Sequence, residues 1–213
     1  MKIDRIVKKG LGNVLILFDD SATLILSIEI FLKSGLKKND EISENRFSAL
    51  IHENKKFHLK QRAFRLLGRR QHSILELKQK LSQKNREPKL INEVLNELST
   101  GGYLDDKKFA LVFTEEKLRT KYWGEKKLKS ELIKKGIDAG TITEVLNQHI
   151  TSENKLQSAE LLAVKKLDQL RHRKFDLQTL RKKVAAFLMT KGYDYDIIKE
   201  VSNKILGDYY QDE

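Results

Sequence analysis

The chain has 213 residues and is strongly basic, since 42 Lys and Arg outnumber 30 Asp and Glu and leave a formal net charge of +12. With 39% hydrophobic residues, one proline and no run of about 18 apolar residues, the composition excludes a disordered tail and a membrane-spanning helix. The absence of cysteine excludes disulfides, thiolate metal ligands and cysteine nucleophiles, and we expect a cytoplasmic protein with no membrane association.

Residues 1–42 have the pattern of a small antiparallel sheet. The segments IDRIV, NVLILF and SATLILSI are short and rich in β-branched and leucine side chains, and KKGLGN and DDS separate them as turns. The segment IEIFLKSG then predicts one short helix that ends at Gly35. We therefore expect a small β-rich N-terminal segment over 1–42.

From residue 43 onward the apolar spacing is that of helices, and one pattern occurs three times. The segments LKQKLSQKN (77–85), LKSELIKKG (128–136) and VAAFLMTKG (184–192) align, and an isoleucine and a valine follow each of them at equal distances. The aligned apolar sets are Leu77, Leu128 and Val184; Leu81, Leu132 and Leu188; Ile91, Ile142 and Ile198; and Val94, Val145 and Val201. Each copy predicts a helix, a turn and a second helix.

A further amphipathic stretch precedes each copy, so the repeating unit is three helices. The predicted fold is mainly α, an elongated tandem array of three three-helix repeats with helix-turn-helix character behind the β-rich segment. We expect a linking helix and repeat 1 over 43–105, repeat 2 over 106–152 and repeat 3 over 153–213. Bundles this small bury little surface alone, so neighbouring repeats should pack together.

Several residues are expected to begin or end these helices. Ser73 and Glu76 in SILE have the spacing of a capping box, and Gly124 is a weaker cap at the same place in repeat 2. The residues that fall where each aligned helix should end in a left-handed conformation are Asn85, Gly136 and Gly192.

The adjacent carboxylates Asp105 and Asp106 lie between the third helix of repeat 1 and the first helix of repeat 2. A carboxylate at a helix start accepts bonds from free amides and meets the positive end of the helix dipole. Two lysines follow and Phe109 begins the next apolar face, which is the pattern of a cap. The alternative, a metal-binding or acid–base pair, lacks further ligands because no histidine is near in the sequence.

Other signs of chemistry are weak. The segment GLGN at 10–13 has no third glycine and no following Lys-Ser/Thr, so it does not predict a phosphate-binding loop. The histidines, which are never spaced as an i, i+4 pair, are His52, His58, His72, His149 and His172. We expect no catalytic residues, no metal and no cofactor.

Basic residues concentrate in three groups, one in each repeat. Those that we expect to form a basic binding face are Arg62, Arg65, Arg69, Arg70, Arg119, Lys121, Lys126, Lys127, Lys129, Lys134, Lys135, Arg171, Arg173, Lys174, Arg181, Lys182 and Lys183. If one face of the array collects them, they form a basic stripe that suits nucleic acid or a nucleoprotein. The alternative is ordinary solvated helix faces.

The single tryptophan, Trp123, lies within the second basic group. It could stack on a base or on a partner side chain as part of the binding face. The alternative is that it packs the joint between helices.

Three segments, in this order and spacing, resemble the RecX regulatory proteins, the modulators of the bacterial RecA recombinase: RRQHSILELKQKL, GYLDDKKFA and WGEKKLKSELIKKGI. The matching residues are Arg70, Ser73, Glu76 and Leu77; residues 103 to 110; and Gly124, Leu128, Glu131, Leu132, Lys135, Gly136 and Ile137. The resemblance is strongest over 63–146 and weaker in the third repeat.

The resemblance implies a helical array without catalytic activity that binds along the groove of the RecA filament on DNA. There it would restrain ATP hydrolysis, strand exchange and coprotease activity, and so control recombinational repair and the SOS response. It also implies binding to single- or double-stranded DNA, directly or through RecA, and we expect a monomer. Whether the net effect is inhibition, filament disassembly or stimulation stays open. The alternative function is an autonomous nucleic-acid-binding protein built from tandem tri-helical modules.

Overall fold

The computed structural model describes residues 1–173 and 175–209. The chain divides into two compact units, of which the first is Met1–Gln71 with Leu77–Tyr103 and the second is His72–Glu76 with Leu104–Glu213. The first unit has an apolar cluster around Ile16 and Leu50, and the second unit has separate apolar clusters around Leu128 and around Val184.

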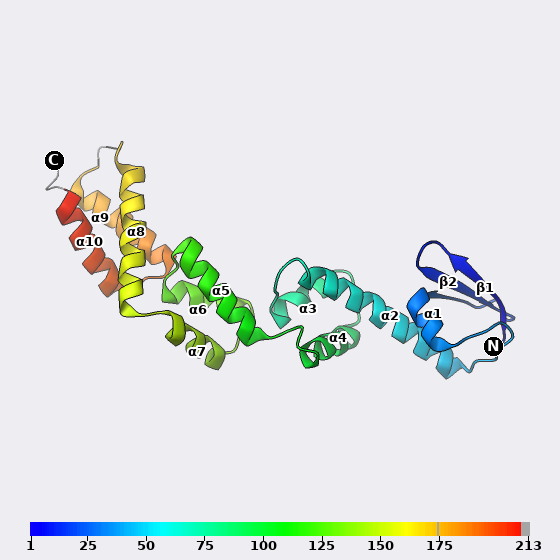
Figure 1. Cartoon of the computed structure of the whole chain (residues 1–213). Helices are drawn as coiled ribbons and strands as arrows, with labels where there is room; N and C mark the ends of the chain where they lie inside the picture. The colour runs from blue at the N-terminus through cyan, green and yellow to red at the C-terminus, as the bar shows by residue number, and fades with distance from the viewer. Residues whose placement is uncertain (174, 210–213) are drawn as a thin grey trace. The chain divides into compact units, whose positions relative to one another are not determined.

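The first unit begins with a three-stranded antiparallel sheet in the order β1-β2-β3, formed by β1 (Ile3–Lys9), β2 (Asn13–Phe18) and β3 (Thr23–Ser27) (Figure 1). Alternate residues of β2 are buried, which is the period expected of a strand with one covered face. Helix α1 (Ile28–Ser34) follows and ends at Gly35, whose φ of 69° is the left-handed conformation predicted for it. The sheet and the short helix predicted for this segment are both confirmed.

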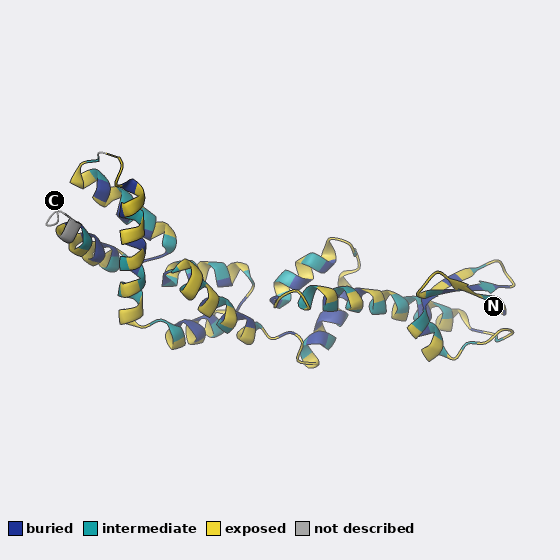
Figure 2. Cartoon of the chain, turned by 45° about the horizontal axis from the view of Figure 1, so that its top comes forward, coloured by how far each residue is buried: buried dark blue, intermediate teal, exposed yellow. Residues whose placement is uncertain are grey.

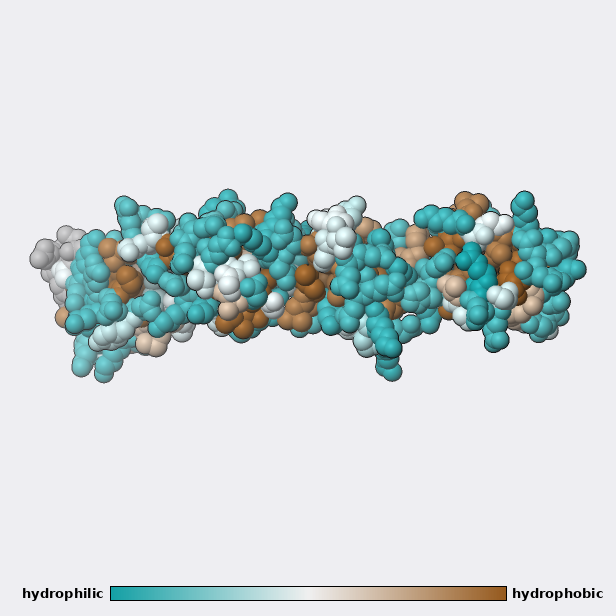
Figure 3. Space-filling model, turned by 90° about the horizontal axis from the view of Figure 1, so that it is seen from below, coloured by the Kyte–Doolittle hydropathy of each residue, from teal (hydrophilic) through white to brown (hydrophobic). Residues whose placement is uncertain are grey.

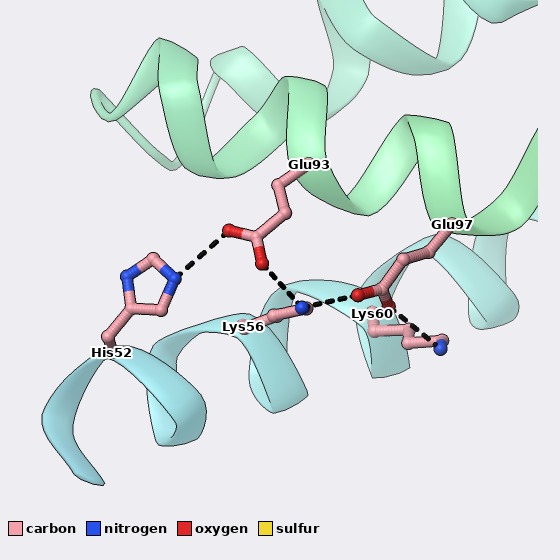
Figure 4. A network of polar contacts seen from close by, with 5 residues as sticks. All are labelled: His52, Lys56, Lys60, Glu93 and Glu97. Carbon is pink, nitrogen blue, oxygen red and sulfur yellow. Dashed lines mark hydrogen bonds and ion pairs between the residues drawn. The ribbon is translucent and has the colours of Figure 1, made fainter. Parts of the chain in front are cut away.

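Helix α2 (Glu44–Leu67) packs against β3 and α1 near its start and against α4 (Pro88–Thr100) later. A polar network joins α2 to α4, as Figure 4 shows: Lys56 lies between Glu93, at 2.5 Å, and Glu97. His52 contacts the same Glu93 at 3.0 Å, and Lys60 contacts Glu97 at 3.1 Å. The Lys56 ammonium lowers the pKa of both carboxyl groups, so both acids are held in their charged form.

The second unit contains two consecutive three-helix repeats. Helices α5 (Asp106–Lys121), α6 (Glu125–Lys134) and α7 (Ala139–His149) form the first of these, and α8 (Ser152–Leu170), α9 (Leu177–Lys191) and α10 (Tyr195–Tyr209) form the second. Helix α3 (Ile74–Ser82), whose first turn belongs to the second unit, is the equivalent of α6 and α9. Figure 2 shows buried and exposed residues interleaved along the helices of the repeats.

The aligned apolar positions are buried in all three copies. Leu77, Leu128 and Val184 are at most 1% exposed, and the equivalent leucines one turn later, Leu81, Leu132 and Leu188, are fully buried. The aligned isoleucines and valines of the following helix are at most 3% exposed. The same spacing therefore fills the same core in each repeat, because positions four residues apart lie on one face of a helix.

The prediction of a left-handed residue at Asn85 is wrong. Gly136 and Gly192 have φ of 80° and 91°, but Asn85 is not among the residues with positive φ. Helix α3 ends earlier, at Ser82, and the Asn85 side chain accepts a hydrogen bond from the Glu87 amide, 2.7 Å away. An asparagine side chain that bonds to the backbone two residues later forms its own turn, so the left-handed conformation is not needed.

The fold class is thus confirmed as mainly helical, with three three-helix repeats behind a small antiparallel sheet. Within the described residues, no helix has the length and apolar character required to cross a membrane.

Two neighbouring residues of α6 test whether the aligned positions form the core. Replacing the fully buried Leu132 by alanine should lower the free energy of unfolding by about 2–5 kcal/mol, because a cavity is left in a closed core. Replacing Ile133, which is 56% exposed, should change it by about 0.5 kcal/mol or less. Urea unfolding followed by circular dichroism measures both, and equal losses would contradict the assigned core.

Candidate functional site

The start of α6 is joined to the end of α9 by backbone hydrogen bonds. The Gly124 amide donates to the Lys191 carbonyl at 2.8 Å, and the Lys126 amide donates to the Gly192 carbonyl at 3.2 Å. The first amides and last carbonyls of a helix have no partner within the helix. Here the two ends satisfy one another, and opposite ends of two helix dipoles meet. We call this contact the α6–α9 joint.

At both glycines of the α6–α9 joint there is no room for a side chain. A Cβ on Gly124 would lie 2.5 Å from the Gly192 carbonyl oxygen, and a Cβ on Gly192 would lie 2.3 Å from the Lys127 amide nitrogen. These neighbours are backbone atoms and cannot move aside by a change of rotamer. The Lys126 ammonium completes the joint by contacting Asp194 at 2.8 Å.

The first turn of α3 meets the end of α6 in the same register, and we call this contact the α3–α6 joint. The Ser73 hydroxyl donates to the Lys135 carbonyl at 2.7 Å and accepts from the Glu76 amide at 3.1 Å. The Lys135 ammonium lies 3.1 Å from the Glu76 carboxylate. Gly136 is needed because a Cβ there would lie 2.7 Å from the Cβ of Leu75. In the α3–α6 joint the Ser73 hydroxyl donates to a carbonyl at the end of the neighbouring helix, as the Gly124 amide does in the α6–α9 joint.

The two adjacent carboxylates serve two different helices. Asp105 caps α5, since it accepts from the Lys108 amide at 2.9 Å. Asp106 instead accepts from the Ile74 amide at 2.8 Å and so holds the first turn of α3. Burial raises the pKa of Asp106, and the nearby charges of Asp105 and Asp138 raise it further, against the opposing effect of the Ile74 hydrogen bond.

Trp123 is half-buried and packs within repeat 2, with its ring 6.2 Å from that of Phe113 in an edge-to-face arrangement. The ammonium groups of Lys117 and Lys127 lie over the Trp123 ring, 6.0 Å and 5.7 Å from its centroid. Such contacts stabilise by about 0.5–1 kcal/mol at exposed sites. The contacts of Trp123 are those of a residue that packs between helices, and the residue is also partly exposed to solvent.

A cavity of about 390 Å³ opens beside Trp123, within the second unit. Its apolar lining comes from Leu118, Tyr122, Trp123, Ile150, Leu161 and Tyr193, and its polar lining includes Arg119, His149 and the ion pair Lys155–Glu125 at 2.5 Å. Tyr122 ends α5 in a left-handed conformation with φ of 49°, and its carbonyl accepts from the Tyr193 hydroxyl at 2.9 Å. Burial raises the pKa of Tyr193 to about 12, so this hydroxyl stays protonated as a donor.

Eight of the residues predicted for the binding face have intramolecular contacts. Trp123, Lys126, Lys127 and Lys135 are in the contacts given above, and Lys134 is 2.8 Å from Glu131. Arg62 donates to the Lys80 carbonyl at 3.1 Å, and Arg70 donates to the Gln71 carbonyl at 2.8 Å. Lys183 lies 4.6 Å from the centroid of the Phe175 ring. Of these cations, Lys126 and Lys135 form ion pairs that join one repeat to another.

Nine others are exposed, and within the described part of the chain their side chains have no ion pair or hydrogen bond: Arg65, Arg69, Arg119, Lys121, Lys129, Arg171, Arg173, Arg181 and Lys182. They come from α2 and the turn after it, from α5 and α6, and from α9 and the turn before it. We call them the unpaired cations. The remaining predicted residue, Lys174, lies outside the described residues.

The sequence indicated Ser73, Gly124 and Gly136 as residues that begin or end helices, but it did not indicate which residues they contact. Asp194, Tyr193 and Tyr122 were missed, and the aligned KG dipeptides at 135–136 and 191–192 were the available signal for a shared contact. Among the described residues, no three His, Asp or Glu side chains are grouped as metal ligands would be.

Comparison with known families identifies each repeat separately. Residues 60–98, 105–146 and 153–201 match the models described as the first, second and third three-helix domains of RecX. Two similar proteins, both called regulatory protein RecX, are those of Clostridium botulinum (strain Eklund 17B / Type B), at 30% identity over 94% of this chain and 93% of that protein, and of Clostridium perfringens (strain 13 / Type A), at 27% identity over 96% and 95%.

Two solved structures have a similar fold. A crystal structure of regulatory protein RecX superposes with a TM-score of 0.73 at 21% identity, over 95% of this chain and 98% of that one. A crystal structure of RecX from Lactobacillus salivarius superposes with a TM-score of 0.59 at 25% identity, over 70% of this chain and 95% of that one.

Adding one methyl group tests the α6–α9 joint. Gly124→Ala should lower the free energy of unfolding by about 1–3 kcal/mol, because its Cβ would press on the Gly192 carbonyl. Gly207→Ala makes the same chemical change in α10, where nothing lies within 4 Å, and should stabilise by up to about 1 kcal/mol. Thermal unfolding of both variants measures these two changes in stability. A stabilising Gly124→Ala would show that the two helix ends do not meet.

Asp106 predicts a dependence of stability on pH. Because its folded pKa lies above the ordinary value of 3.8, folding favours its neutral form. This contribution is complete below the unfolded pKa and is lost as pH rises through the folded pKa. Asp106→Asn keeps an acceptor for the Ile74 amide without a buried charge, so it should be at least as stable as the parent at neutral pH, and its advantage should vanish in acid.

The control is Asp106→Ala, which removes the acceptor and should cost about 0.5–2 kcal/mol at neutral pH. Unfolding measured from pH 3 to pH 7 on the three proteins separates loss of the bond from loss of the charge. If the parent gains stability over Asp106→Asn as pH rises, the burial of this carboxylate is wrongly assigned.

Proposed function

Because the chain belongs to the RecX family of regulatory proteins, we propose that it binds the filament that RecA forms on DNA and modulates the activity of RecA, mainly by inhibition. The observation that carries this proposal is the distribution of the unpaired cations. Every repeat contributes some of them, and no single helix collects them.

A spread of cations over repeated units fits a long anionic partner better than a short base sequence. Sequence-specific recognition by a helix-turn-helix module concentrates its contacts in one recognition helix. Phosphate contacts, in contrast, position a protein and carry no sequence information directly. We therefore propose that the repeats bind the DNA-bound polymer through many weak contacts, with the filament groove as the site.

Binding of this kind would act on RecA without chemistry of its own. A protein that occupies successive subunits favours the filament conformation that it fits best, and it can shift RecA only by its difference in affinity between conformations. Slower ATP hydrolysis, strand exchange and coprotease cleavage would follow from a filament held in one state. We propose that this control of recombinational repair and of the SOS response takes place in the cytoplasm, with a monomer as the binding form.

A second function, autonomous nucleic-acid binding, is favoured by the net charge of +12 and predicts a different result with RecA absent. Binding to bare DNA depends strongly on salt, with log K falling by about 0.7 to 0.9 per phosphate contact for each unit of log salt concentration. A RecA modulator should bind coated DNA more tightly than bare DNA and should slow DNA-dependent ATP hydrolysis. Equal affinity for both DNA forms, with unchanged hydrolysis, would replace the first function by the second.

A four-residue charge neutralisation tests the role of the unpaired cations. Changing Arg119, Lys121, Arg181 and Lys182 together to glutamine should weaken binding to RecA-coated DNA about tenfold or more, since 1.4 kcal/mol corresponds to a factor of ten. The matched control changes the exposed cations Lys8, Lys9, Lys33 and Lys38 of the first unit, which alters the net charge equally. Fluorescence anisotropy of labelled DNA gives both affinities. Equal losses would assign the effect to total charge alone.

A further inference from the structure

The cavity beside Trp123 is not explained by the joints or by the unpaired cations. Its volume of about 390 Å³ is within the range of pockets that hold a ligand group, about 300–1,000 Å³. We propose that it receives one large apolar side chain, aliphatic or aromatic, from the partner protein, and that a carboxylate of the partner lies next to that side chain. This inference rests on the proposed function, because RecA is the partner through which it is tested.

The lining suits an apolar side chain. Leu118, Ile150 and Leu161 supply aliphatic surface, and Tyr122 and Trp123 supply aromatic surface. Leu161 is 49% exposed on α8, so the opening presents apolar surface to solvent. Figure 3 shows that apolar surface on this face of the molecule is broken up by hydrophilic surface. The exposed Leu161 is notable because it lines a cavity. A buried anchor in a pocket is the commonest source of strong local binding in protein interfaces.

The charged residues at the cavity indicate which kind of residue should lie next to the partner's apolar side chain. Arg119 lines the cavity, and Lys121 follows on the same helix, and neither forms an ion pair with a described residue. The carboxylate of Glu125 is already paired with Lys155. The lining therefore has one positive charge that forms no ion pair, that of Arg119, and electrostatic complementarity favours a partner segment with an acid beside its apolar side chain.

The same observations disfavour a nucleobase in this cavity. The ammonium groups of Lys117 and Lys127 already lie over the Trp123 ring. These contacts fix the ring as part of the cavity wall, so it is less available to stack on a base. A base is therefore the outcome that would overturn the proposal.

The test uses two lysine substitutions on exposed apolar residues of α8. Leu161→Lys places a charge on the cavity wall, and Val164→Lys adds the same charge one turn later, at a side chain of similar exposure (46%) that does not line the cavity. Binding governed by charge alone would be equal or tighter for both variants, because each becomes more basic. The proposal predicts that Leu161→Lys weakens binding to RecA-coated DNA about tenfold, while Val164→Lys changes it by no more than about twofold.

Trp123 supplies a direct readout because it is the only tryptophan in the chain. With 5-hydroxytryptophan incorporated there, its emission can be excited selectively in the presence of RecA. We expect a saturable change in emission with RecA-coated DNA for the parent and for Val164→Lys, and none for Leu161→Lys at equal occupancy. An emission change with a bare oligonucleotide that Leu161→Lys abolishes would place a base in the cavity and overturn the proposal.

The failures are distinguishable. If the parent neither binds coated DNA better than bare DNA nor slows ATP hydrolysis, the proposed function fails and this inference with it. If the parent does both and Leu161→Lys matches Val164→Lys in affinity and emission, the cavity inference alone is wrong.

Discussion

The hydrogen bonds between helix ends are the interaction on which the second unit depends. The free amides of α6 meet the free carbonyls of α9, and the first turn of α3 meets the end of α6 in the same register. A three-helix bundle of this size has a small core, so it gains from a neighbour that satisfies its helix ends as well as burying its sides. The joints also explain why small residues occupy these places, since Gly124 and Gly192 approach one another closer than a side chain allows.

The joints divide the basic residues into two classes. Lys126 and Lys135 form ion pairs with Asp194 and Glu76 across the joints, and Lys127 packs against Gly192. The unpaired cations are left for a partner, because their side chains form no ion pair or hydrogen bond with a described residue and can attract an anion. The motif residues Ser73, Glu76, Gly124, Lys135 and Gly136 thus build the scaffold, and none of the unpaired cations is one of the matching residues of the motifs.

The sequence predicted what is local or periodic and missed what is brought together by folding. Leu77, Leu128 and Val184 were predicted as core because helical period alone places them on one face, and the Gly35, Gly136 and Gly192 helix ends follow from the conformational freedom of glycine. The left-handed conformation predicted for Asn85 was wrong because the Asn85 side chain accepts a hydrogen bond from the Glu87 amide and forms a different turn. The bond from Ile74 to Asp106 spans 32 positions, and no local pattern encodes it. The cavity was missed for the same reason, since its walls come from α5, the segment 122–125 that leads into α6, the end of α7, α8 and the segment after α9.

Amide hydrogen exchange tests the joints most directly. The Gly124 and Lys126 amides begin a helix and would exchange freely unless another chain segment accepts their bonds. We expect both amides to be protected to about the level of the α6 interior. The Ser152 and Glu153 amides, which begin α8 with no acceptor among the described residues, should exchange quickly. Exchange of Gly124 and Lys126 as fast as Ser152 and Glu153 would contradict the docking of helix ends.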